Sequence, residues 1–267
     1  MNINITIGQF YPIDSKIHRL DPRAKLLATF VFIAALFFVN DIYGYILSAL
    51  SIGVIILISK VPFKYLLKGL KAIIGIIIFT AVLNIFFAGG KTVIFSFYFI
   101  KITAEGLILA AKMATRLVLL VIASSMLTLT TSPIELTDGI EYVLKPFKKI
   151  GVPAHEIAMM MTIALRFIPT LMEEVDKIMK AQIARGADFD TGNIMQKAKS
   201  MIPLLVPLFI SAFRRADDLA MAMEARCYQG DAHRTRMKIL KFNDNDYIFC
   251  AILIAYAAVT VVMGIIL

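Results

Sequence analysis

The chain has 267 residues, of which 59% are apolar and 18% are charged. Soluble domains carry roughly 45–50% apolar residues, so this composition excludes a water-soluble globular protein and predicts a membrane protein. The net charge of +9 does not imply nucleic acid as a partner, because polytopic membrane proteins concentrate Lys and Arg in their cytoplasmic loops. Two cysteines and three histidines are too few for a disulfide framework or a Cys/His metal cluster, and no cofactor is expected.

Five apolar runs are long enough to cross a hydrocarbon core of about 30 Å at about 1.5 Å per residue, the shortest only marginally. They are Ala24–Asn40, Ile42–Ser59, Leu70–Ala88, Gly106–Thr130 and Tyr247–Leu267. The fold class predicted from them is an all-α integral membrane protein with about five transmembrane helices. We expect an N-terminal membrane domain at 1–130, an inserted helical domain at 131–245 and a C-terminal transmembrane helix at 246–267. The N-terminus lacks the pattern of a cleaved signal, so we expect the first run to be retained.

Loop charges predict the orientation of these helices in the membrane. Residues 1–25 contain four Lys or Arg, residues 60–71 contain four, and residues 131–245 contain sixteen, whereas the other side has only Lys91 and Lys101. The positive-inside rule places the three basic segments in the cytoplasm, which makes 131–245 a cytoplasmic domain.

Residues 131–245 are predicted to be largely helical. Ser132, Pro133 and Glu135 have the spacing of a capping box and begin a helix that is expected to reach about Lys148. Two longer helices follow at about 153–185 and 193–226, joined by a glycine- and aspartate-rich turn. Their internal prolines are expected to bend them.

The two long helices end in a repeated pattern, Ala-x-x-Ala-Arg followed by a small residue, with an aspartate nine residues before each arginine. The positions are Ala184, Arg185 and Gly186 after Asp176, and Ala225, Arg226 and Cys227 after Asp217. Small neighbours allow a helix end to enter a groove in another protein, where the arginine fork can bind a carboxylate. The alternative is that each arginine only complements the helix dipole and that Gly186 only ends its helix.

Three further groups of polar residues are candidates. Asp21, Pro22 and Arg23 either cap and begin the first helix or bring Arg23 into contact with the cytoplasmic segment. Lys112 and Arg116 share one face of the fourth span. They either pair with Glu105 or lipid headgroups near the outer side, or make a polar contact inside the bundle or with a partner. Asn84, in the third span, is able to hydrogen-bond between helices, but we expect no more than packing from it.

Several of these segments together resemble the transmembrane T component, EcfT, of energy-coupling factor transporters, which are uptake systems related to ABC transporters. The resemblance covers nearly the whole chain. Its motifs are Leu20–Lys25, Leu127–Pro133, Arg166-Phe167-Ile168-Pro169, Ala181–Gly186 and Ala225-Arg226.

The resemblance implies a non-catalytic subunit of an ATP-driven transporter in the prokaryotic cell membrane. Its partners would be two ATP-binding cassette ATPase subunits, alike or different, a substrate-binding S component for a vitamin or metal ion, and membrane lipid. It gives the two arginine motifs the role of ATPase docking at the ends of helices that cross in an X. Cys227 departs from this pattern, which has glycine there. The alternative function is a self-sufficient secondary transporter or channel, although the spans show no clear internal repeat.

Overall fold

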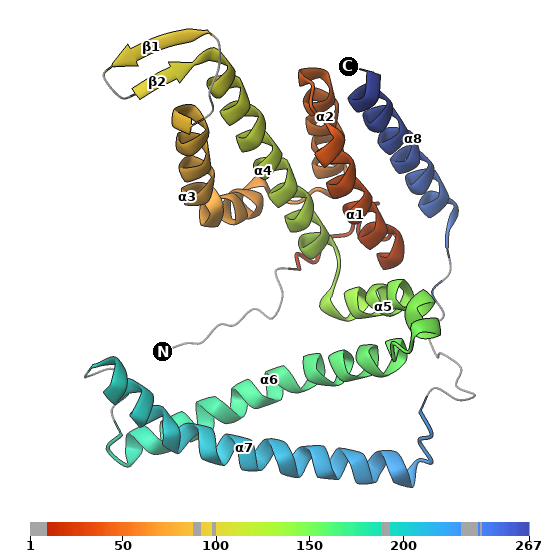
Figure 1. Cartoon of the computed structure of the whole chain (residues 1–267). Helices are drawn as coiled ribbons and strands as arrows, with labels where there is room; N and C mark the ends of the chain where they lie inside the picture. Colours follow the sequence, from red (N-terminus) through yellow and green to blue (C-terminus); the bar gives the residue numbers. More distant parts are fainter. Residues whose placement is uncertain are drawn as a thin grey trace. The chain divides into compact units, whose positions relative to one another are not determined.

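Two compact units make up the chain in the computed structural model, whose described residues are 10–87, 92–97, 100–187, 189, 193–230, 240 and 242–266. The membrane unit comprises residues 1–143 and 238–267, and the inserted unit comprises residues 144–237. Figure 1 shows the helices of both units. In the membrane unit the helices and strands are α1 (Pro22–Phe38), α2 (Ile42–Ser59), α3 (Phe63–Phe87), β1 (Val93–Phe97), β2 (Ile100–Thr103), α4 (Ala104–Thr130), α5 (Pro133–Leu144) and α8 (Asp244–Ile266). The inserted unit contains a 3-10 helix, η1 (Lys145–Ile150), and two long helices, α6 (Ala154–Ala184) and α7 (Ile194–Ala225).

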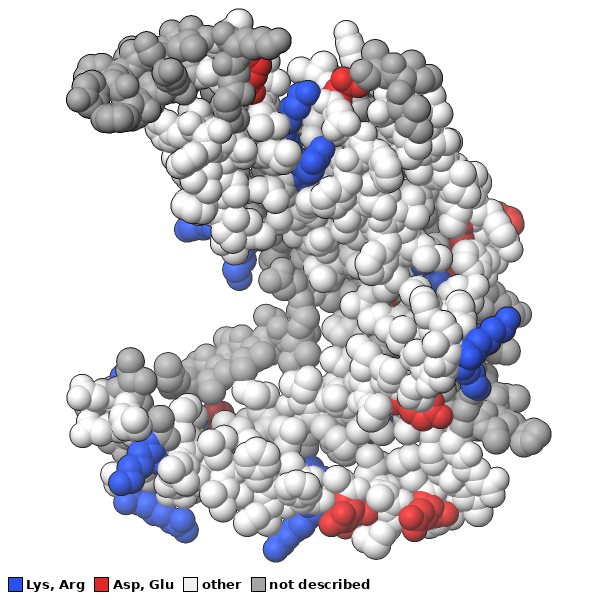
Figure 2. Space-filling model, viewed as in Figure 1, with Lys and Arg blue, Asp and Glu red and all other residues white. Residues whose placement is uncertain are grey.

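Four helices of the membrane unit, α2, α3, α4 and α8, are long and apolar enough to cross a bilayer. This confirms the all-α membrane class. Of the five predicted spans, the first is the one that falls short, because α1 has 17 residues and rises only about 25 Å. Much of the surface seen in Figure 2 carries no charge, as expected of side chains that face lipid.

The core of the membrane unit lies between α1, α2, α4 and α8. Phe32 of α1 stacks on Tyr256 of α8 with ring centroids 5.3 Å apart, and the Tyr256 and Ser48 hydroxyl oxygens are 2.7 Å apart. Near the other end of α8, a Cβ added to Gly264 would lie 2.2 Å from the carbonyl oxygen of Phe38. Small residues allow membrane helices to approach this closely.

Two features of the membrane unit differ from the sequence-based prediction. Strands β1 and β2 form an antiparallel hairpin between α3 and α4, with Ser96 opposite Lys101, which adds a short sheet to the helical fold. Lys91 lies outside the described residues. Helix α5 belongs to the membrane unit rather than to the inserted segment, and its Gly139 lies so close to α1 that an added Cβ would be 3.3 Å from the Pro22 carbonyl oxygen.

The inserted unit has the helices that were predicted, with nearly the predicted ends. The capping box at the start of α5, just before this unit, is present, since Ser132 and Glu135 each accept the other's backbone N–H at 3.3 Å. The α-helix that follows ends at Leu144, and 3-10 geometry continues it to Ile150. Pro169 lies inside α6, and Pro203 and Pro207 lie inside α7, so these prolines do not end either helix.

Candidate functional site

The ends of α6 and α7 have the same backbone hydrogen bonds. In α6 the Gly186 N–H donates to the Ile183 carbonyl at 2.9 Å, and the Ala187 N–H donates to that of Gln182 at 3.0 Å. In α7 the Cys227 N–H donates to the Glu224 carbonyl at 2.8 Å, and the Tyr228 N–H donates to that of Met223 at 3.0 Å. Both ends are therefore Schellman motifs, in which the residue after the cap adopts the left-handed conformation.

In both motifs the arginine is the C-cap residue, and the residue after it has a positive φ. The φ angle is 87° at Gly186 and 56° at Cys227. Glycine adopts this conformation freely, whereas a residue with a side chain is strained there. Cys227 therefore keeps the backbone shape that the glycine supplies in the first motif, but with a conformational strain that the first motif lacks.

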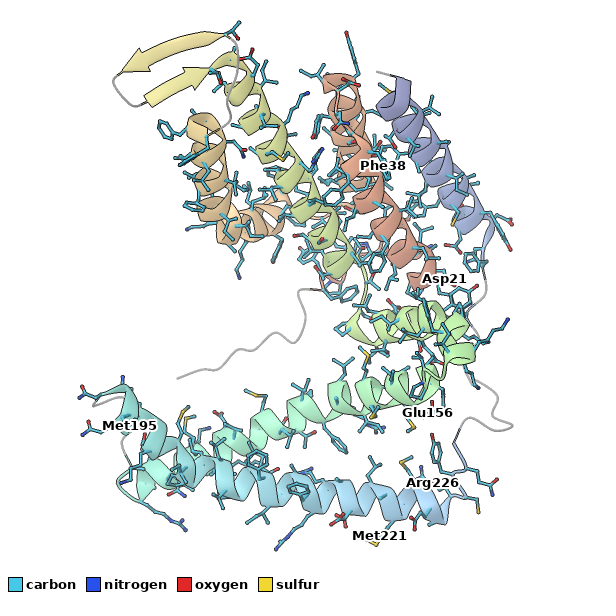
Figure 3. All side chains as sticks on the ribbon, in the orientation of Figure 1. Asp21, Phe38, Glu156, Met195, Met221 and Arg226 are labelled. Atoms are coloured by element: carbon cyan, nitrogen blue, oxygen red, sulfur yellow. The ribbon has the colours of Figure 1, made fainter. Side chains whose placement is uncertain are left out.

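All six residues of the two predicted tips are solvent-exposed: Ala184, Arg185, Gly186, Ala225, Arg226 and Cys227. Arg226 is labelled at the end of α7 in Figure 3. Each arginine thus extends from the end of a rigid helix, and neither tip folds back into the unit.

Contacts between α6 and α7 hold the two tips apart. The Gln182 side-chain amide lies 3.4 Å from the Pro203 carbonyl oxygen, so the end of α6 lies beside the early part of α7. A groove of about 270 Å³ between the helices is lined by Ile163 on one side and Met223 on the other, so the end of α7 lies beside the early part of α6. Because Ile163 precedes Arg185 by 22 residues, the tips are separated by about 30 Å along α6.

An ion pair connects the middle of the two helices. Arg215 of α7 donates to Glu174 of α6 at 2.9 Å. A hydrogen bond from Ser211 and the nearby Arg215 guanidinium lower the pKa of the Glu174 carboxyl against the opposing effect of partial burial. This ion pair, together with the hydrogen bond from Ser211, holds α6 in register against α7.

The remaining predicted residues of the inserted unit do not gather around the tips. Arg166, Pro169 and Asp217 are exposed along the two helices. Asp176 lies 3.5 Å from Lys180, one turn later in the same helix. Although Asp176 and Asp217 each precede an arginine by nine residues, the structure does not give the two aspartates a contact of the same kind.

The Asp-Pro-Arg motif caps the first helix, and its arginine contacts α5, which belongs to the membrane unit. Asp21 caps α1 by accepting the Arg23 N–H at 2.9 Å, and Pro22 is the first helical residue. The Arg23 guanidinium also lies over the ring of Tyr142 in α5, 4.6 Å from its centroid.

Sequence reasoning missed two buried charged residues close to this motif. Lys25 is 5% exposed and Asp246 is 1% exposed. The Lys25 ammonium donates to the carbonyls of His18 at 2.9 Å and Thr130 at 3.0 Å, and Asp246 of α8 accepts the backbone N–H of Asp21 at 2.9 Å. A lysine at the start of an apolar run and an aspartate at the start of another were the available signals.

The polar residues of the spans contact main chain. Lys112 donates to the Asn40 carbonyl at 2.6 Å in an exposed contact, and Arg116 donates to the Val39 carbonyl at 2.8 Å in a partly buried one. Asn84 donates at 2.9 Å to the Thr80 carbonyl of its own helix. This bond within its own helix agrees with the expectation that Asn84 contributes no more than packing. Within the described residues, no group of three His, Cys, Asp or Glu side chains is placed to hold a metal ion.

Comparisons with known proteins place these features in a family context. Residues 14–238 match the CbiQ family, described as cobalt transport protein. Three similar curated proteins bear the name "Energy-coupling factor transporter transmembrane protein EcfT". The one from Clostridium kluyveri is 61% identical, with 94% of each chain covered. That from Thermosediminibacter oceani is 58% identical over 91% of each chain, and that from Ruminiclostridium cellulolyticum is 54% identical over 97% of each chain.

Proposed function

Because the chain belongs to the family of EcfT transmembrane components of energy-coupling factor transporters, we propose that it is the non-catalytic scaffold that couples two ATPase subunits to a substrate-binding S component. The ATPases bind the two arginine tips, and the S component binds the membrane helices and the outer faces of α6 and α7. The S component determines which vitamin or metal ion is taken up. From the bacterial relatives we infer a location in the prokaryotic cell membrane, and from the loop charges a cytoplasmic inserted unit.

The observation that carries this proposal is that the two helix ends have the same structure. Two Schellman motifs, each with an exposed arginine as its C-cap residue, present the same shape and charge at two separate points. An exposed arginine at the end of a rigid helix can enter a groove and form a two-pronged contact with a carboxylate. Two equivalent tips about 30 Å apart suit a pair of similar subunits better than a single partner.

The apolar surface of the inserted unit supports the second contact. Large apolar side chains are exposed along both helices, among them Met160 and Ile168 on α6 and Phe209, Ile210 and Phe213 on α7. Exposed apolar surface on this scale marks a binding surface for protein or membrane. Methionine adapts its shape to different partners, and several methionines lie on these helices, which suits a scaffold that receives more than one S component.

Charge reversal at the tips tests ATPase binding. Arg185→Glu and Arg226→Glu each remove one charge-assisted contact of about 1.5–3 kcal/mol and also place a carboxylate against the carboxylate of the partner. Each single variant should therefore bind the purified ATPases at least about 10-fold more weakly. The double variant should lose far more, because the two tips act as a bivalent attachment. Arg214→Glu is the matched control, since Arg214 is an exposed arginine on α7 away from either tip, and its binding should stay at the wild-type level.

Two outcomes would contradict the proposal. Unchanged ATPase affinity in both single variants would show that the tips do not bind ATPases. Uptake by the chain alone in liposomes, without any ATPase, would instead identify a self-sufficient secondary transporter or channel.

A further inference from the structure

A buried set of contacts surrounds the first turn of α1, and the proposed function does not account for it. We call it the α1 junction, and it consists of Asp21, Arg23, Lys25, Thr130, Tyr142 and Asp246. These residues come from α1, α4, α5, α8 and the segment just before α1. Asp21 is labelled in Figure 3 close to the start of α1. Residues up to 225 positions apart in sequence are thus joined at one place in the membrane unit.

Asp246 fixes the start of α8 to the start of α1. Its two carboxylate oxygens accept different backbone N–H groups, that of Asp21 at 2.9 Å and that of Asn243 at 2.8 Å. The side chain is 1% exposed, so water cannot replace either bond. Loss of one acceptor would leave a buried N–H without a partner, which proteins avoid.

Lys25 fixes the end of α4 in the same way. Its ammonium group donates to the Thr130 carbonyl, one of the last carbonyls of α4, and to the His18 carbonyl before α1. The last carbonyls of a helix lack partners within the helix, and a cation is favoured beside them. Lys25 therefore closes the corner at which α4 gives way to α5.

Helix α5 completes the junction. Its Gly139 lies against the Pro22 carbonyl, and its Tyr142 ring lies under the Arg23 guanidinium at 4.6 Å. The chain runs from α5 into the inserted unit, whose first residue is 144. The backbone returns to the membrane unit at residue 238, before α8. A displacement of the inserted unit that is passed along the backbone therefore reaches the junction through α5 on one side and through the start of α8 on the other.

We propose that Lys25 and Asp246 are positioning residues that join α5, α1, α4 and α8 into one rigid block, so that movement of α5 displaces the membrane helices. This inference rests on the proposed function. Without these contacts the bend between α4 and α5 would absorb the movement, and ATP would be hydrolysed without transport. Lys25 and Asp246 would therefore transmit movement by connecting the helices, and each helix would still form without these contacts.

The test measures transport per ATP hydrolysed in the complete complex of this chain with its ATPases and an S component, reconstituted in liposomes. Three variants loosen the junction: Asp246→Asn, Lys25→Met and Tyr142→Leu. Asparagine keeps the size of Asp246 but offers only one acceptor oxygen. Tyr142 is 44% exposed, so leucine is tolerated there even if Lys25→Met prevents folding. Tyr256→Phe is the control, because it removes a buried hydrogen bond between α2 and α8 that does not involve α5.

We expect the junction variants to retain bound ATPases and near wild-type ATP hydrolysis, while transport per ATP falls at least about fivefold, the lower end of typical coupling between sites. Tyr256→Phe should leave that ratio unchanged. Wild-type transport per ATP in all junction variants that assemble would overturn the inference, as would a parallel loss of ATPases and transport, which indicates a purely structural role. ATPase binding that survives Arg185→Glu with Arg226→Glu would refute the proposed function separately.

Discussion

The strained cysteine at the second tip gives a prediction that depends only on local backbone geometry. Cys227 has φ of 56°, and a residue with a side chain pays about 1–2 kcal/mol in the left-handed region. Glycine avoids this strain but loses more backbone entropy on folding, which offsets about 0.5–1 kcal/mol. Cys227→Gly should therefore stabilise the end of α7 by about 0.5–1 kcal/mol.

The assay is amide hydrogen exchange at Tyr228, whose N–H donates to the Met223 carbonyl and closes the Schellman motif. Since local opening limits exchange at a helix end, a stabilisation of about 0.5–1 kcal/mol slows exchange about two- to fivefold. The reverse change, Gly186→Cys, should speed exchange at Ala187, because it imposes the same strain at φ of 87° on the first tip.

Cys227→Ala separates backbone strain from the chemistry of the thiol. Alanine removes the sulfur but keeps a Cβ at positive φ, so exchange at Tyr228 should stay close to wild type. The reasoning would be refuted if Cys227→Gly left exchange unchanged, or if alanine slowed it as much as glycine does.

Three other predictions concern the interior of each unit. The pKa of Glu174 is lowered in the folded state, so the ionised carboxylate contributes stability above the usual value of 4.5, and this stability is lost as pH falls through the folded pKa. Glu174→Gln should remove this part of the acid dependence in thermal unfolding of the detergent-solubilised chain. An unchanged pH profile would contradict this prediction. Gly264→Ala should destabilise the membrane unit by about 1–3 kcal/mol, since the added Cβ would overlap the Phe38 carbonyl. The control Gly53→Ala should be neutral or slightly stabilising, because its Cβ meets nothing within 4 Å. Equal unfolding temperatures for the two variants would refute the close approach of α1 and α8. Tyr256→Phe should lower stability by only about 0.5–1 kcal/mol, because the Ser48 hydroxyl still donates to the Gly44 carbonyl; a much larger loss in the same assay would mean that the Tyr256 hydroxyl has a further role.

Helix boundaries were predictable where local residue types determine them, whereas α3 begins at Phe63, seven residues before its apolar run, and α5 ends at Leu144 instead of about Lys148. Ser132 and Glu135 form the expected capping box, and Asp21 caps α1 as expected. The ends of α6 and α7 lie within a residue of their predicted positions, since the arginine and the residue after it form the cap in both. Such signals act over three or four residues, so one sequence contains them completely.

The partners of the buried charges were not predictable, because most of them are backbone groups. Asp246 accepts a main-chain N–H, and Lys25 donates to main-chain carbonyls. Every residue but proline offers the same N–H and every residue the same carbonyl, so the partner leaves no trace in residue type or spacing. Asn84 shows the same limitation, because a membrane amide can bond within its own helix as readily as across helices.

The two cations of the fourth span bond to backbone carbonyls at the end of the short first helix. At 17 residues, α1 rises about 25 Å, which is about 5 Å less than the thickness of a hydrocarbon core of about 30 Å. Its last carbonyls would then face a region without water, where unsatisfied backbone groups cost several kcal/mol. Lys112 and Arg116 donate to the Asn40 and Val39 carbonyls, just after that end, and a cation is favoured beside the negative end of a helix. Because residues four apart share one helix face, α4 supplies both donors to a single turn. Lys112 and Arg116 therefore supply hydrogen-bond donors to carbonyls that lie just beyond the end of the first helix.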